Sequence, residues 1–185
     1  MVNKINMMED IAEVLVDEEA LQAKIKAVGA QISRDYCGKC PILVGILKGV
    51  VPFYAAMAQA ITIPMEQDFM SISSYSGTQS TGVITYRKDL DLDIEGRDVL
   101  ILEDILDSGR TLKAVTDNLL QRKPASLKIC TLLDKPDGRV VELDADYVCF
   151  TIPDSFVVGF GLDYDEYYRN LPFVGILKPS VYQDK

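Results

Sequence analysis

The sequence predicts an α/β fold in which helices cover a parallel sheet. Short apolar runs that are typical of buried parallel strands alternate with segments whose apolar residues recur at helical spacing. The chain has 185 residues, of which 48% are hydrophobic, so it is long enough to bury one substantial core and lies within the single-domain range. No internal repeat, linker or low-complexity tract interrupts the alternation.

The first part of the chain predicts two helices around a strand. Acidic residues at 17–19 favour a helix start because they lie near the positive end of the helix dipole, and an apolar stripe follows at helical spacing. Residues 41–47 form an apolar run that predicts a buried strand. Pro52 occupies the place of a first-turn proline in a further helix, which extends to about Ala60. The stripe of the first helix consists of Leu21, Ile25, Val28 and Ile32.

The rest of the sheet is expected from later apolar runs. Strands are predicted at residues 61–70 and 83–87, on either side of a stretch, residues 73–82, that is rich in hydroxyl groups and glycine and should be mobile without a ligand. A helix is predicted from Gly109 to Gln121, ending before Pro124. The remaining strands are predicted at residues 98–102, 127–133 and 147–151.

The pattern changes after Pro153. No regular period is visible there and aromatic residues are frequent, which favours a smaller lobe over the edge of the sheet. These aromatic residues are Phe156, Phe160, Tyr164, Tyr167, Tyr168 and Phe173.

Charge and composition exclude several classes of function. The chain carries 19 basic and 28 acidic residues, a net charge of −9, so its field repels nucleic acid and anionic membranes. No apolar run reaches the roughly 18 residues that a membrane span needs, and the amino terminus lacks the apolar stretch of a signal peptide. We therefore expect a cytoplasmic protein without nucleic-acid or membrane partners. The chain has no histidine, which excludes a histidine base.

Cysteine spacing leaves one alternative open. Cys37 and Cys40 have the C-x-x-C spacing of a redox pair, but they follow a helix and precede a strand, whereas a redox pair normally follows a strand. No histidine or second pair completes a zinc site. We expect two reduced thiols in a surface loop, with a redox role as the alternative. Cys130 and Cys149 lie in apolar strand patterns, which predicts small core residues.

The most informative segment joins a predicted strand to the following helix. It contains three carboxylates, Glu103, Asp104 and Asp107, which would repel one another unless cations or hydroxyl donors lay between them. The backbone N–H groups of residues 107–111 can form a concave nest at the positive end of a helix, which suits a phosphate monoester. Together these features favour a site for a phosphorylated sugar. An ordinary turn, capped by Asp107 or Ser108, is the alternative.

The string Glu-Asp-x-x-Asp-Ser-Gly-x-Thr at residues 103–111 resembles the 5-phosphoribosyl 1-pyrophosphate (PRPP) signature of type I phosphoribosyltransferases. More closely, the chain is similar to the bacterial hypoxanthine-guanine members of that family. Further segments match in the order of the family and extend the resemblance from about Ile11 to Pro179. They are residues 45–49, 73–76, 80–82, 132–135, 152–164 and 168–172.

The resemblance implies one domain, residues 1–185, with the parallel-sheet fold of the family. It implies a Rossmann-like core at about 37–152, a small irregular hood from residues 1–16 and 153–185, and a flexible lid loop at about 73–82. It also implies a homodimer or homotetramer whose partners are otherwise the small-molecule substrates PRPP and a purine base.

The implied reaction is purine salvage: the 5-phosphoribosyl group passes from PRPP to N9 of hypoxanthine or guanine, giving IMP or GMP and pyrophosphate, with Mg²⁺ as cofactor. By carry-over from the family, Glu103 and Asp104 would hold the ribose hydroxyls and residues 107–111 would cradle the 5-phosphate. Asp107 would also act on N7 of the purine as general acid/base, a role commonly worth about 10² to 10⁴ in rate. The implied PRPP-binding set is Glu103, Asp104, Asp107, Ser108, Gly109, Arg110 and Thr111.

The resemblance implies that three residues bind pyrophosphate and that two positions of the lid loop approach it. Closure of the lid would exclude water from the sugar. It also implies a cis peptide bond between Leu47 and Lys48. From the residues alone, Lys48 is a solvated charge and Arg169 is the ion-pair partner of Asp165 or Glu166. The pyrophosphate set is Lys48, Gly49 and Arg169, and the lid positions are Ser74 and Tyr75.

The purine is also assigned by the resemblance. Lys135 would donate to O6, Phe156 would stack on the base, and Val157 would present backbone groups to its edge. Asp163 would bind Mg²⁺ or the base. From the residues alone, Lys135 is a surface lysine and a lone phenylalanine such as Phe156 is more often a core residue. The implied metal ligands are Glu103, Asp104 and Asp163.

Three other functions remain as alternatives. A xanthine-preferring phosphoribosyltransferase differs only in its contacts with the purine 2-position, which backbone geometry decides. A PRPP-sensing regulatory protein of the same fold would bind RNA or DNA, but the chain has no excess of basic residues for this. A phosphohydrolase would use Asp91 and Asp93, but these residues lie in a polar connection and do not end a buried strand.

Overall fold

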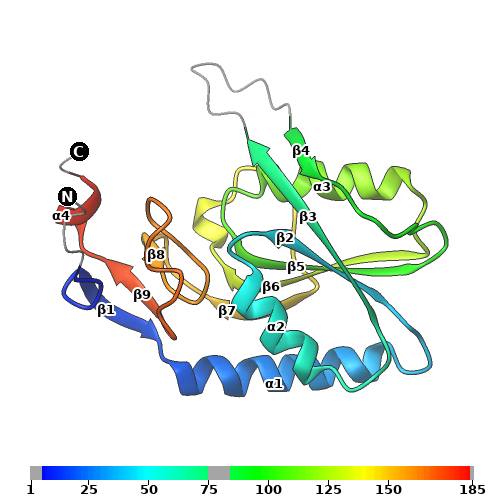
Figure 1. The fold of residues 1–185 in the computed structure, drawn as a ribbon, viewed down its shortest axis with the longest axis horizontal. Coiled ribbons are helices and arrows are strands. Elements are labelled where there is room, and N and C mark those ends of the chain that lie inside the picture. The colour runs from blue at the N-terminus through cyan, green and yellow to red at the C-terminus, as the bar shows by residue number, and fades with distance from the viewer. Residues whose placement is uncertain (1–5, 75–83, 184–185) are drawn as a thin grey trace.

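The chain folds into a six-stranded sheet flanked by helices and a separate three-stranded antiparallel sheet (Figure 1). The computed structural model describes residues 6–74 and 84–183. In chain order the elements are β1 (Ile11–Val16), α1 (Glu18–Asp35), β2 (Ile42–Leu47), α2 (Val51–Ala60), β3 (Glu66–Ser74), β4 (Ile84–Lys88), β5 (Asp98–Leu106), α3 (Arg110–Gln121), β6 (Ser126–Asp134), the short 3-10 helix η1 (Pro136–Gly138), β7 (Tyr147–Thr151), β8 (Val157–Val158), β9 (Val174–Leu177) and α4 (Pro179–Tyr182).

The large sheet has the strand order β4-β3-β2-β5-β6-β7. Strands β3, β2, β5, β6 and β7 are parallel to one another, and β4 pairs antiparallel with β3. The chain passes from β2 to β3 on one side and later places β5 on the other side of β2, so the strand order reverses at the β2–β5 pair. Ligands of open α/β sheets bind at such a reversal, outside the carboxyl ends of the strands.

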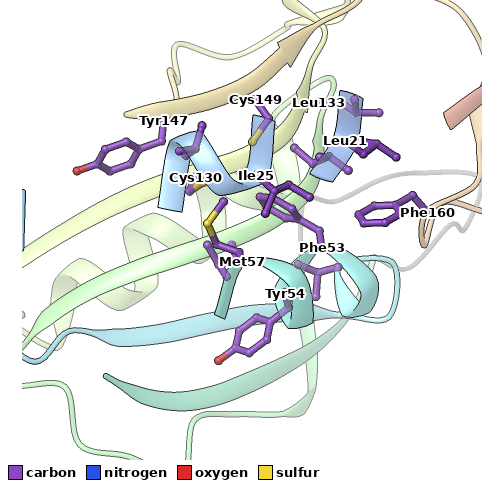
Figure 2. Close-up of a cluster of buried hydrophobic side chains, with 14 of the residues drawn as sticks. Leu21, Ile25, Phe53, Tyr54, Met57, Cys130, Leu133, Tyr147, Cys149 and Phe160 are labelled. Carbon is purple, nitrogen blue, oxygen red and sulfur yellow. The ribbon is translucent and has the colours of Figure 1, made fainter. Parts of the chain in front are cut away.

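Helices α1 and α2 cover one face of the large sheet and α3 covers the other (Figure 1). Alternate residues of β5 separate the two layers, because Leu100 and Leu102 pack with α1 and α2 whereas Val99 and Ile101 pack with α3. Figure 2 shows the first layer, where side chains from both helices and from the strands point toward one another. The labelled members are Leu21, Ile25, Phe53, Tyr54, Met57, Cys130, Leu133, Tyr147, Cys149 and Phe160.

Helix α1 begins where its sequence predicts. Asp17 is the N-cap, and its side chain accepts a hydrogen bond from the N–H of Ala20 at 2.8 Å. Such a cap is typically worth about 1 kcal/mol. The helix leads from the small sheet to the underside of the large one (Figure 1). The predicted apolar stripe is buried as a whole, at Leu21, Ile25, Val28 and Ile32.

The small sheet has the order β1-β9-β8 and combines strands from both ends of the chain. The Tyr168 hydroxyl donates to a carboxylate oxygen of Asp10 at 2.8 Å, and the N–H of Lys178 donates to the carbonyl of Asp10 at 2.9 Å. These contacts tie the two terminal segments together. The predicted small lobe built from them is confirmed.

The predicted boundaries of two strands are wrong, and β3 also continues to Ser74, past its predicted end at 70. Strand β3 begins at Glu66, not at Ile61, because Ile61 ends α2 and Pro64 has no N–H for a sheet ladder. Strand β5 continues to Leu106, beyond the predicted end at 102, because Glu103 still pairs with β6. The adjacent carboxylates of the signature therefore lie inside a strand.

The orientation of β4 also corrects the prediction of a parallel sheet. Residues 75–83 separate β3 from β4, and a parallel pair needs a crossover of about a dozen residues or more. An antiparallel pair needs no such crossover. Helix α3 begins at Arg110, with Gly109 as its N-cap, one residue later than predicted.

The cysteines lie as predicted. Cys37 and Cys40 are exposed in the turn between α1 and β2, and Cys130 and Cys149 are buried in β6 and β7. All four have free thiols. None of the helices formed by the described residues combines the length and apolar character of a membrane span.

Candidate active site

The carboxyl ends of three strands bring the predicted site residues to one edge of the large sheet. Lys48 and Gly49 follow β2, Asp107 follows β5, and Lys135 follows β6. Because these strands are parallel and adjacent, their ends lie side by side at the reversal of strand order. The peptide bond between Leu47 and Lys48 is cis, as the family resemblance implied.

A pocket of about 240 Å³ lies where β5 turns into α3. Gly109 makes the turn with a φ of 77°, in the left-handed region that favours glycine, and it is the N-cap of the helix. The alternative cap residues, Asp107 and Ser108, therefore do not cap α3. A pocket of backbone amides at the start of a helix suits a phosphate group. Its lining consists of Glu103, Ile105, Leu106, Asp107, Ser108, Gly109, Thr111 and Leu112.

Glu103 and Asp104 are neighbours in β5 but meet different surroundings. Glu103 lines the phosphate pocket, and its Oε2 is buried without a hydrogen-bond partner among the described residues. Burial, and to a lesser degree the charge of Asp104, raises the pKa of Glu103 well above its ordinary value. Burial also raises the pKa of Asp104 to about 6, although the N–H of Ile105 and the charge of Arg169 oppose the shift. Such carboxyls favour a ligand that brings hydroxyl donors or a cation.

Asp104 lies directly against the backbone of Gly49, across the β2–β5 pair. A side chain at Gly49 would overlap the Asp104 carboxylate, which would have to move to make room. Gly161 of the hood packs closely on the carbonyl of Gly49. The predicted pyrophosphate loop, a predicted ribose carboxylate and the hood therefore meet at one point.

Lys135 joins two carboxylates. Its Nζ lies 3.1 Å from Asp107 Oδ2 and 2.7 Å from Asp154 Oδ1. The residue is 6% exposed, so its interpretation as a surface lysine is wrong. Burial lowers the pKa of Lys135, but the hydrogen bonds to Asp154 and Asp107 outweigh that effect and hold the pKa above its ordinary value. The lysine is therefore a charged donor at the site.

The hood supplies a cluster of charged residues around Lys48. Lys48 Nζ lies 3.1 Å from Glu166, and Arg169 pairs with Glu166 at 3.3 Å and with Asp163 at 2.9 Å. The N–H of Glu166 donates to Asp163 at 2.9 Å. Asp165 and Glu166 both have positive φ values, 55° and 68°, which turn the chain tightly here. Arg169 thus has one of the partners expected from the residues alone, Glu166, and one that was not expected, Asp163.

Phe156 lies in an aromatic cluster of the hood. Its ring is 40% exposed and stacks on Tyr182, with ring centroids 4.8 Å apart and an interplanar angle of 22°. The edge of Tyr164 approaches at 5.7 Å. Phe156 is therefore no core residue. The next residue, Val157, is buried in β8 and pairs with Ile176 of β9.

Three predicted site residues either lie outside the lining of the pocket or are not fully described by the structure. Arg110 begins α3 and is exposed outside the lining of the phosphate pocket. Ser74 ends β3, and the structure describes only its backbone. Tyr75 and most of the predicted lid loop at 73–82 lie outside the described residues.

Sequence reasoning missed two residues of the site and underrated a third. Asp154 follows a proline in an irregular segment, and nothing local indicates its ion pair with Lys135. Arg139 follows a turn signal at 136–138, but its contacts with the phosphate loop are long-range. Glu166 was considered only as a surface partner of Arg169, because sequence gives no hint of its contact with Lys48.

The donor set fits Mg²⁺, the cofactor that the family resemblance implies. Among the described residues no cluster of three or more acidic, cysteine or histidine side chains forms a metal site made by the protein alone. Mg²⁺ commonly binds through one or two carboxylates, together with water and substrate phosphates. The unpartnered Glu103 Oε2 and the adjacent Asp104 carboxyl have the oxygen chemistry for such a shared site.

Comparison with known proteins agrees with this fold. Residues 12–165 match the family model of the phosphoribosyl transferase domain, and the chain therefore belongs to the phosphoribosyltransferases. It is 56% identical over 176 residues to the hypoxanthine-guanine phosphoribosyltransferase of Streptococcus pneumoniae, which covers 95% of this chain and 98% of that protein.

Solved structures of two such enzymes superpose on this chain over nearly its full length. The hypoxanthine phosphoribosyltransferase of Staphylococcus aureus is 51% identical with a TM-score of 0.93, covering 97% of this chain and 98% of that one. The hypoxanthine-guanine phosphoribosyltransferase of Bacillus anthracis is 45% identical and superposes with a TM-score of 0.87. The match covers 91% of this chain and 99% of that one.

Proposed function

We infer that the protein is a purine salvage enzyme that works as a hypoxanthine-guanine phosphoribosyltransferase. It transfers the 5-phosphoribosyl group of PRPP to N9 of hypoxanthine or guanine and releases pyrophosphate. The observation that carries this inference is the amide-lined pocket at the reversal of strand order, with Asp107 of its loop paired to the buried Lys135. The 56% identity to a hypoxanthine-guanine phosphoribosyltransferase, over nearly the full length of both chains, supports it.

The loop after β5 would hold the sugar. N–H groups of residues 107–111 would donate to the 5-phosphate, while Glu103 and Asp104 would accept from the ribose hydroxyls. Positive charge develops at C1 as its bond to pyrophosphate lengthens, and fixed carboxylates near the sugar stabilise that charge. Loop and strand together would align C1 with the attacking purine nitrogen.

The pair of Lys135 and Asp107 would meet one edge of the base. Lys135 would donate to O6, and Asp107 would exchange a proton at N7 as N9 attacks. Phe156 would stack on the ring, and backbone groups of Val157 would meet the base edge. Since the chain has no histidine, a carboxylate is the available group for proton transfer at this place.

The leaving group would be met by Lys48, the N–H of Gly49, and Arg169. Lid positions Ser74 and Tyr75 would complete the enclosure and keep water from the sugar. When bound, Mg²⁺ neutralises charge on the pyrophosphate. The carboxylates that would hold the ion are Glu103, Asp104 and Asp163.

We propose further that residues 1–185 act as one domain, with a core at about 37–152 and a hood from 1–16 and 153–185. The enzyme would work in the cytoplasm as a homodimer or homotetramer, with PRPP and a purine base as its partners. Sedimentation equilibrium would test the oligomeric state, since a monomer at micromolar concentration would contradict it.

Steady-state rates with hypoxanthine, guanine and xanthine, at saturating PRPP and Mg²⁺, test the function. We expect turnover with hypoxanthine and guanine and little with xanthine. A clear preference for xanthine would overturn the base assignment. Absence of nucleotide formation with every base, together with specific nucleic-acid binding in a low-salt filter assay, would favour the regulatory alternative.

A further inference from the structure

Arg139 contacts the phosphate loop, residues 106–109, but is not among the residues that line the pocket. Its Nε donates to the carbonyl of Asp107 at 2.9 Å, and Nη2 donates to the carbonyl of Leu106 at 3.2 Å, a carbonyl that also accepts from the N–H of Lys135 at 3.0 Å. The same Nη2 pairs with the carboxylate of Asp134, and Nη1 donates to the carbonyl of Leu143. The Arg139 side chain is 13% exposed, whereas Asp107, whose carbonyl accepts from Nε, is an exposed residue.

The residue after Arg139 adds a third contact of the same kind. The N–H of Val140 donates to the carbonyl of Ser108 at 3.1 Å. Gly109 leaves space for this segment, because a side chain at Gly109 would meet Arg139 Cδ and Val141 Cγ2, each at 2.9 Å. The chain after η1 therefore packs against the loop and donates hydrogen bonds to three successive carbonyls, those of residues 106–108.

These carbonyls decide where the amides of the loop point. A peptide group is planar and trans, so the C=O of one residue and the N–H of the next point in opposite directions. Holding the carbonyls of residues 106–108 toward Arg139 and Val140 turns the N–H groups of residues 107–109 to the other side, and these residues line the pocket. Within the described parts of the chain none of these three N–H groups has an acceptor, so all three are free for phosphate oxygens.

We propose that Arg139 is a positioning residue of the phosphate loop. By holding the carbonyl of Asp107, and by sharing that of Leu106 with the N–H of Lys135, it keeps the loop amides aimed at the 5-phosphate before the ligand arrives, so that binding has less backbone to order. The inference rests on the proposed function, because it takes the 5-phosphate of PRPP as the ligand of this loop. It assigns no contact with substrate to Arg139.

Isothermal titration calorimetry of Arg139→Gln, Arg139→Lys and Arg139→Ala tests the proposal. Binding of GMP, which carries a 5-phosphate, is compared with binding of pyrophosphate, which does not. We expect Arg139→Gln to weaken GMP binding about 10- to 100-fold, by analogy with the loss of an outer hydrogen-bond partner of a metal ligand, and to leave pyrophosphate binding unchanged. Lysine should restore little, because an ammonium group cannot span two carbonyls as the planar fork does. Added guanidinium should restore GMP binding to Arg139→Ala.

Arg122→Ala is the matched control. Arg122 follows α3, and it pairs with Asp89 at 2.8 Å and with the Asn118 side chain at 2.8 Å. This variant also loses an arginine with several hydrogen bonds, but none of them reaches the phosphate loop. It should bind GMP and pyrophosphate like the parent protein.

Three outcomes would overturn the proposal: unchanged GMP binding in Arg139→Gln, equal losses for GMP and pyrophosphate, or losses that follow a lowered unfolding temperature and are not rescued by guanidinium. The last two would show a purely structural role. Failure of the proposed function gives a different result, because the unsubstituted protein would then bind neither GMP nor PRPP and would form no nucleotide.

Discussion

Lys135 Nζ lies 3.1 Å from Asp107 Oδ2, so the residues assigned to O6 and N7 of the purine form an ion pair in the protein alone. O6 and N7 are neighbours on one edge of a purine. A base that accepts a hydrogen bond from Lys135 at O6 would therefore present N7 toward Asp107. Asp154, 2.7 Å from the same lysine, supplies a second counter-charge while Asp107 exchanges its proton.

Asp107→Asn should lose turnover and largely keep PRPP binding. An amide of the same size preserves the loop but cannot exchange a proton at N7, and general acid/base catalysis commonly contributes about 10² to 10⁴ in rate. Steady-state kcat for hypoxanthine and guanine, with Kd for PRPP from calorimetry, checks this expectation.

Asp154→Asn is the control for that variant. It removes the other carboxylate from Lys135 without touching the proposed proton-transfer group. Its loss of kcat should be much smaller than that of Asp107→Asn. Near-normal turnover of Asp107→Asn would place the proton role elsewhere, and equal losses in both variants would trace the effect to the charge of the ion pair.

Gly49→Ala should destabilise the protein and weaken PRPP binding. The added methyl group would overlap the Asp104 carboxylate and force it away from its position beside β2. Overpacking of this kind typically costs about 1 to 3 kcal/mol of the free energy of unfolding. Urea unfolding and the KM for PRPP measure the two effects.

The double variant Gly49→Ala with Asp104→Ala separates those effects. Removal of the carboxylate relieves the overlap, so much of the stability should return. PRPP binding should stay weak, because a proposed ligand of the ribose is gone. A single Gly49→Ala variant with unchanged stability and affinity would show that the close contact is unimportant.

Glu166→Gln should strengthen binding of pyrophosphate. Glu166 neutralises Lys48 at 3.1 Å and Arg169 at 3.3 Å, the two cations proposed for the leaving group, and an incoming anion must displace it. Because ion pairs of exposed residues contribute little in water, the gain should be small, no more than about fivefold. Calorimetric titration with pyrophosphate measures it.

Glu66→Gln is the matched control, since Glu66 makes an ion pair of 3.2 Å with Arg97 at the start of β3. It should leave the affinity for pyrophosphate unchanged. Weaker binding in Glu166→Gln would instead mean that Glu166 holds Lys48 in place for the ligand.

Asp68→Asn should destabilise the fold in a pH-dependent way. Asp68 is 4% exposed, pairs with Lys88 at 3.2 Å, and accepts N–H bonds from Phe69, Asp91 and Leu92. Burial raises the pKa of Asp68, but these hydrogen bonds outweigh it and hold the pKa below its ordinary value of 3.8. The unfolded chain therefore takes up this proton at higher pH than the folded one. The stabilisation is complete above about pH 4 and is lost as the pH falls through the pKa of the folded state.

Urea unfolding at neutral pH and below pH 4 checks that sign. The variant should lose about 1 to 3 kcal/mol at neutral pH, because buried N–H groups lose a charged acceptor, and its difference from the parent should shrink in acid. Asp93→Asn, on the same connection, is the control, and a pH-independent difference for Asp68→Asn would contradict the argument. Asp91 pairs with Lys88 at 2.9 Å, and its side chain is 81% exposed at the surface of this connection.

The sequence alone determined what depends on neighbours along the chain. The start of α1 follows from the acidic residues at 17–19, its apolar stripe follows from helical spacing, and the turn before α3 follows from the string at 103–111. Capping, periodicity and turn chemistry involve groups only a few residues apart, so a short stretch of sequence is enough to predict them. The family resemblance extended this to the roles expected of distant segments.

Only the tertiary structure decided which distant groups meet. It buried Lys135 between Asp107 and Asp154, continued β5 through its carboxylates, and packed Arg139 against the phosphate loop. Each of these features depends on desolvation and hydrogen bonds between segments far apart in the chain. Such contacts leave no period or local preference in the sequence. The partner that stabilises each of these residues comes within reach only when the sheet and hood assemble.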